Sequence, residues 1–250
     1  MANPIDDLAS VWYDIKKYYG FDKDELKGIV VAVLVLAFIV SFDDWGVEKF
    51  EFFYGLKNLF NSMLIVLLSF LVYLSAQRIT AIKSGFKAEW RVWTYGLLIG
   101  LVLVFVSRGK LWFLAPGGVI VYHMAGHRIC GFRYGLNYWP LGMSAIMGPL
   151  ACAVLAIIFN LLLGVFPENS LLEKAMRVNI WLAIINMLPI PPLDGSNLFF
   201  ATRMVYVFLL GLVLGTLIPL LFSIHILYSL LIGLIAGFIL WQVLFWTLER

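Results

Sequence analysis

Residues 204–246 read MVYVFLLGLVLGTLIPLLFSIHILYSLLIGLIAGFILWQVLFW and contain no Asp, Glu, Lys or Arg. A helix needs roughly 20 apolar residues to cross the hydrocarbon core of a bilayer. Strands of a membrane barrel would instead alternate apolar and polar residues over about ten positions. The continuous apolar run therefore predicts two membrane helices, 204–222 and 224–247, joined by a minimal turn as a helical hairpin.

The composition of the whole chain extends this interpretation. Of its 250 residues, 62% are hydrophobic and only 13% are charged, against about 25% charged residues in soluble domains. The mean hydropathy is +0.94. A soluble domain of this length has too small an interior to bury so much apolar surface. We therefore predict an all-α, polytopic helical membrane protein in a lipid bilayer, and a net charge of +3 gives no indication of nucleic-acid binding.

Apolar runs elsewhere in the chain bring the expected number of membrane segments to about eight. The segments are expected near 27–42, 59–77, 92–107, 111–130, 141–166, 175–193, 204–222 and 224–247.

The charged loops predict an orientation. The loop QRITAIKSGFKAEWR, residues 77–91, holds four basic residues against one acid, Glu89. Loops rich in Lys and Arg face the cytoplasm, and the mainly acidic loop before it then faces outward. Counting segments in both directions predicts that the N- and C-termini are cytoplasmic. Arg108 and Lys110 are the exception, because this count places them outside.

Two histidines lie in the fourth expected segment, where polar side chains are rare. His123 and His127 are four residues apart, so on a helix both rings project from one face. Two imidazoles on one helical turn can chelate a divalent metal, as in the H-E-x-x-H zinc motif. The alternative is a pair of histidines hydrogen-bonded to neighbouring helices.

A carboxylate follows a proline-rich break at the end of the sixth expected segment. The stretch NMLPIPPLDG, residues 186–195, contains three prolines before Asp194, and proline cannot continue a regular helix. Broken backbone at membrane depth is tolerated only where it is buried in protein or lines a cavity. The predicted topology places Asp194 at a depth similar to that of the two histidines. Two histidines and one carboxylate leave a fourth position open, which is typical of catalytic zinc; the alternative is a carboxylate that caps backbone amides freed by the prolines.

These motifs resemble those of the site-2 protease family of intramembrane zinc metalloproteases. The family pattern N-x-x-P-x-x-x-L-D-G matches in full from Asn186 to Gly195, and H-E-x-x-H has its counterpart in HMAGH, residues 123–127. Between them, Gly148-Pro149-Leu150 resembles the G-P-x-x-N element, with Cys152 where asparagine is usual. The resemblance covers roughly residues 112–200 and implies a three-helix core.

The resemblance also implies a site and a substrate. It implies that one zinc ion is bound by His123, His127 and Asp194, and that Asn186 lies beside the substrate. The substrates or clients would be membrane-embedded protein helices, cut near the cytoplasmic face. Cys130, three residues after His127, is either a substitute ligand or a core thiol.

One departure from the pattern bears on activity. Met124 occupies the position of the glutamate that serves as general base, and a thioether cannot carry a proton. We therefore expect a catalytically impaired homologue that binds zinc and membrane helices. The alternatives are an active intramembrane metalloprotease with a replacement base, and a membrane transporter or scaffold.

The expected organisation has four parts. These are a cytoplasmic tail or interfacial helix at 1–26, flanking membrane helices at 27–107, the metal-binding core at 108–203 and the C-terminal hairpin at 204–250.

Overall fold

The computed structural model describes residues 12–13, 15–46, 51–123 and 138–248, and in these ranges the chain is mostly helical. Four of its helices are long and apolar enough to cross a membrane, namely α3, α5, α8 and α9. This supports an integral membrane protein. The elements are α2 (Lys23–Ser41), α3 (Phe52–Lys83), β1 (Phe86–Val92), α4 (Thr94–Val106), β2 (Gly117–His123), α5 (Tyr138–Val165), α6 (Ser170–Asn186), α7 (Asp194–Ala201), α8 (Arg203–Leu221) and α9 (Ile226–Leu248).

Seven of the eight expected segments coincide with helices, namely α2, α3, α4, α5, α6, α8 and α9. Beyond the four helices that can span, the number of crossings stays a prediction. The same holds for the four-part organisation and for the orientation of the termini. The sixth segment, expected to run to 193, ends as a helix at Asn186, because the prolines that follow cannot continue it.

In the fourth expected segment, 111–130, the structure describes residues 111–123, and for these the helix prediction is wrong. Residues 117–123 form β2, which pairs antiparallel with β1 in a two-stranded sheet, so the all-α prediction is also incomplete. Val119 and Val121 are buried, while Ile120 and Tyr122 are each 39% exposed, which is the alternation of a half-buried strand. Gly118 lies so close to the Pro192 carbonyl oxygen that no Cβ would fit there. The β-branched residues and the close backbone approach favour a strand, although the run is as apolar as a membrane helix.

The basic loop expected at 77–91 is also ordered differently. Helix α3 continues to Lys83, and β1 begins at Phe86. Arg78 is buried inside α3 and forms an ion pair with Glu25 of α2. Arg78 is therefore paired within the protein and cannot be counted as a loop charge when the orientation is derived.

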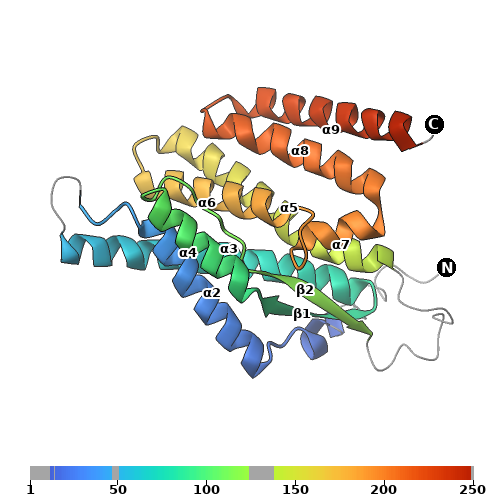
Figure 1. Ribbon diagram of the computed structural model, residues 1–250, viewed down its shortest axis with the longest axis horizontal. Helices are drawn as coiled ribbons and strands as arrows, with labels where there is room; N and C mark the ends of the chain where they lie inside the picture. The colour runs from blue at the N-terminus through green and yellow to red at the C-terminus, as the bar shows by residue number, and fades with distance from the viewer. Residues whose placement is uncertain (1–11, 14, 47–50, 124–137, 249–250) are drawn as a thin grey trace.

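The helices pack around one main core, to which α2, α3, α4, α5, α6 and α8 contribute buried side chains. Helices α8 and α9 lie side by side along the top edge of Figure 1, away from the β1–β2 sheet. Their backbones approach closely through glycines, since a Cβ on Gly211 would lie 2.7 Å from the Cα of Gly237. Small residues permit this approach between membrane helices, and the two helices expected in this region are present as the adjacent pair α8 and α9.

Candidate functional site

Asp194, the carboxylate of the L-D-G motif, is the first residue of α7 and is completely buried. Its Oδ2 accepts hydrogen bonds from the Tyr73 hydroxyl and from Gln77 Nε2, the latter at 2.6 Å. Its Oδ1 accepts a hydrogen bond from the backbone N–H of Val119 at 2.9 Å. The carboxylate thus joins α3, β2 and α7. Burial raises the pKa of the Asp194 carboxyl to about 6, while the hydrogen bonds from Tyr73, Val119 and Gln77 lower it.

The two side-chain donors come from one face of α3. Tyr73 and Gln77 are four residues apart and are 0% and 1% exposed, so they project in the same direction from the helix. Gln77 Nε2 also donates to the Ala145 carbonyl of α5 at 2.9 Å. The amide nitrogen therefore makes both of the hydrogen bonds that its two protons allow.

The Gly-Pro element of α5 packs directly against these two side chains. A Cβ on Gly148 would lie 2.7 Å from Cζ of Tyr73 and 2.8 Å from Nε2 of Gln77. Glycine at this position lets α3 and α5 approach each other. Cys152, one turn further along α5, is also completely buried.

Asn186 is the last residue of α6 and is completely buried. Its Nδ2 donates to the carbonyls of Leu182 at 2.8 Å and Leu114 at 3.1 Å, which ties α6 to the segment that leads into β2. Its Oδ1 has no hydrogen-bond partner among the described residues. The role beside a substrate stays a prediction.

The structure describes the backbone of only one of the two predicted histidine ligands. His123 is the last residue of β2 and pairs with Phe86 of β1, so its backbone is extended rather than helical. His127, Met124 and Cys130 lie outside the described residues. Val119, whose backbone N–H donates to Asp194, is four residues before His123 in the same strand.

These contacts bear on whether the Asp194 carboxylate could serve as a metal ligand. A carboxylate offers about four acceptor positions, and protein donors fill three of them at Asp194. Within the described ranges, no group of three or more His, Cys, Asp or Glu side chains is close enough to hold a metal ion. The described side chains that contact Asp194, a phenol and an amide, are therefore hydrogen-bond donors and not zinc ligands, and zinc binding by His123, His127 and Asp194 stays a prediction.

Sequence reasoning missed Tyr73 and Gln77. A usable signal was present, because two polar side chains four residues apart interrupt an apolar stretch of α3. Tyrosine and glutamine are not typical metal ligands, and so a pattern of metal-ligating residues does not include them.

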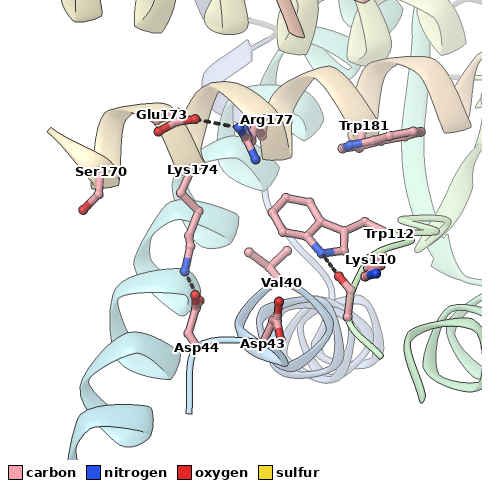
Figure 2. Close-up of a pocket in the computed structure, with 11 residues that line it drawn as sticks. Val40, Asp43, Asp44, Lys110, Trp112, Ser170, Glu173, Lys174, Arg177 and Trp181 are labelled. Atoms are coloured by element: carbon pink, nitrogen blue, oxygen red, sulfur yellow. Dashed lines mark hydrogen bonds and ion pairs between the residues drawn. The ribbon is translucent and has the colours of Figure 1, made fainter. Parts of the chain in front are cut away.

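A second polar region lies at the opposite end of α6 (Figure 2). A cavity of about 400 Å³ opens there between the end of α2 and the start of α6. Lys174 forms an ion pair with Asp44, and Arg177 forms one with Glu173 at 2.7 Å. Three acidic and three basic side chains line this cavity, so it favours no ligand charge: Asp43, Asp44 and Glu173 against Lys110, Lys174 and Arg177.

Comparison with known proteins identifies one relative. The chain is 31% identical over 183 residues to a protein of Methanocaldococcus jannaschii named "Putative zinc metalloprotease MJ0611", and the match covers 72% of this chain and 85% of the relative. No family model and no solved structure matches the chain.

Proposed function

This chain belongs to the metalloprotease family of its archaeal relative, and we propose that it is a site-2-protease-like membrane protein that binds membrane-embedded helices without cleaving them. The observation that carries the proposal is the set of partners around Asp194. The carboxylate of the L-D-G motif is buried and accepts three hydrogen bonds from protein donors. A carboxylate ligand of a catalytic metal would need to direct a lone pair at the ion instead.

Freeing this carboxylate for a metal would be costly. If Asp194 turned to an ion, the Tyr73 hydroxyl and the Gln77 amide would lose an acceptor in a buried position. A buried donor without a partner costs about 1–3 kcal/mol. The packing of α3 against α5 at Gly148 leaves these donors little room to turn elsewhere.

The sequence supplies an independent argument against hydrolysis. Met124 stands where the general base is expected, and general acid–base catalysis contributes roughly 10²–10⁴-fold to rate. The proposal thus combines a missing base with a carboxylate that is already partnered.

The relative's name favours the alternative of an active metalloprotease. In that account His123, His127 and Asp194 bind one zinc ion, and another residue replaces the base. It requires either that the ion takes the remaining acceptor position of Asp194 or that a hydrogen bond to α3 is released. The two accounts predict different results for metal and for cleavage.

Reconstitution in lipid vesicles tests the proposal. The probes are labelled Leu-Ala peptides with one variable central residue. At about 20 residues they are long enough to span the bilayer. Energy transfer measures association, and gel electrophoresis measures cleavage. We expect association without cleavage, unchanged by a zinc chelator. Cleavage that the chelator or His127→Ala abolishes would establish the active alternative, and absence of association would refute the binding of helices.

A further inference from the structure

The two residues of α3 that donate hydrogen bonds to Asp194 have the same spacing as the two ligands on a metal-binding helix. In the H-E-x-x-H motif the two ligands are four residues apart on one helical face, and the general base follows the first ligand. Tyr73, Leu74 and Gln77 have this spacing in the stretch YLSAQ, residues 73–77. Tyr73 and Gln77 both donate to the same oxygen of Asp194.

The Gly-Pro element and the L-D-G motif both contact Tyr73 and Gln77. Gly148 of the Gly-Pro element would place a Cβ within 2.8 Å of both Tyr73 and Gln77. The L-D-G motif supplies Asp194 itself. Helix α3 is also one of the four helices able to span a membrane, whereas the expected histidine motif begins at His123, the last residue of strand β2. The described elements therefore converge on α3.

We propose that Tyr73 and Gln77 stand at the two ligand positions of a metal-binding helix, and that their hydrogen bonds to Asp194 replace a divalent metal ion. This inference rests on the proposed function, and it adds the reason for the loss of chemistry. A phenol and an amide donate protons to the carboxylate directly, so no cation is needed to compensate its buried charge. In this register the position of the general base falls on Leu74 instead of Met124, and a leucine side chain likewise has no proton to exchange.

The inference predicts that two substitutions convert the site into one that binds a metal ion. Tyr73→His with Gln77→His would bring two imidazoles to Asp194 and recreate a three-ligand set with one position open. The matched control is Leu64→His with Leu68→His, which has the same spacing on the same helix. Leu64 and Leu68 are about half exposed, whereas Tyr73 and Gln77 are buried.

The experiment measures zinc per chain after purification and dialysis, with cobalt absorption spectra as a second readout. The 73/77 variant should retain about one zinc ion per chain, and an added Asp194→Asn should remove it. The unmodified chain and the 64/68 control should each hold at least tenfold less. A folded 73/77 variant that holds no more zinc than the control would overturn the inference.

If the 73/77 variant fails to fold, the zinc content of the unmodified chain tests the inference. The inference expects no stoichiometric zinc, and no change in metal content with His123→Ala and His127→Ala together. Stoichiometric zinc that Asp194→Asn removes would overturn it. These readouts need no peptide, so a zinc-free chain that fails to bind membrane peptides would refute the proposed function alone.

Discussion

The two ends of α6 carry polar groups in opposite settings. Beyond its C-terminal end, Asp194 is completely buried and is satisfied by neutral donors. At its N-terminal end, ~25 Å away along the helix, charged side chains line an open cavity and pair with one another. The difference indicates that the carboxylate in the family motif depends on specific protein partners, whereas water can replace the partners of the charges around the cavity.

The largest expected difference between the two ends comes from removing a carboxylate from each. Asp194→Ala leaves three buried donors without an acceptor, and we expect the free energy of unfolding to fall by about 3 kcal/mol or more. Asp44→Ala removes a partly exposed partner of Lys174 and should cost about 1 kcal/mol or less. Reversible unfolding in mixed detergent micelles measures both, and similar losses at the two ends would contradict the comparison.

The packing beneath the Asp194 network gives a second, smaller contrast within α5. Gly148→Ala would push a methyl group against Tyr73 and Gln77 and should cost about 1–3 kcal/mol through overpacking. Gly164→Ala, in the same helix with nothing within 4 Å of its added Cβ, should be neutral or stabilising by up to about 1 kcal/mol. A tolerated Gly148→Ala would show that the approach of α3 to α5 is looser than described.

The smallest effect is expected from salt at the charged cavity. Lys174→Ala should lower the free energy of unfolding by about 0.2–1 kcal/mol at low ionic strength, and the difference should shrink in 1 M salt, where the Debye length is about 3 Å. The effect of Asp194→Ala should persist in the same salt, because its partners are neutral and buried. A strong salt dependence at Asp194 would place it in contact with solvent.

Much of the fold could be predicted from the sequence, because apolar runs and proline breaks have local causes. The two C-terminal helices follow from such signals, and the prolines after Asn186 explain why α6 ends before the expected residue 193. Strand β2 could not be separated from a helix in this way, since Val119-Ile120-Val121 is equally apolar in either conformation. Its strand form depends on pairing with β1 and on contact with the Pro192 carbonyl.

The candidate site was predictable only in part. Asp194 follows from the L-D-G motif, and the structure gives it a buried position with three hydrogen-bond donors. Its partners on α3 are more than a hundred residues away in sequence, and neither is a typical ligand. The histidine pair was predicted as a ligand set because imidazoles bind metals. Which side chains lie next to Asp194 depends on the fold and cannot be read from residue types.

A double-mutant cycle between Tyr73→Phe and Asp194→Asn tests the central claim most directly. Unfolding is measured for the unmodified chain, both single variants and the double variant, each with and without a zinc chelator. Direct hydrogen bonding predicts a coupling energy of about 0.5–3 kcal/mol that the chelator leaves unchanged. Absence of coupling, together with a loss of stability when the chelator is added, would show that Asp194 binds a metal ion instead of Tyr73.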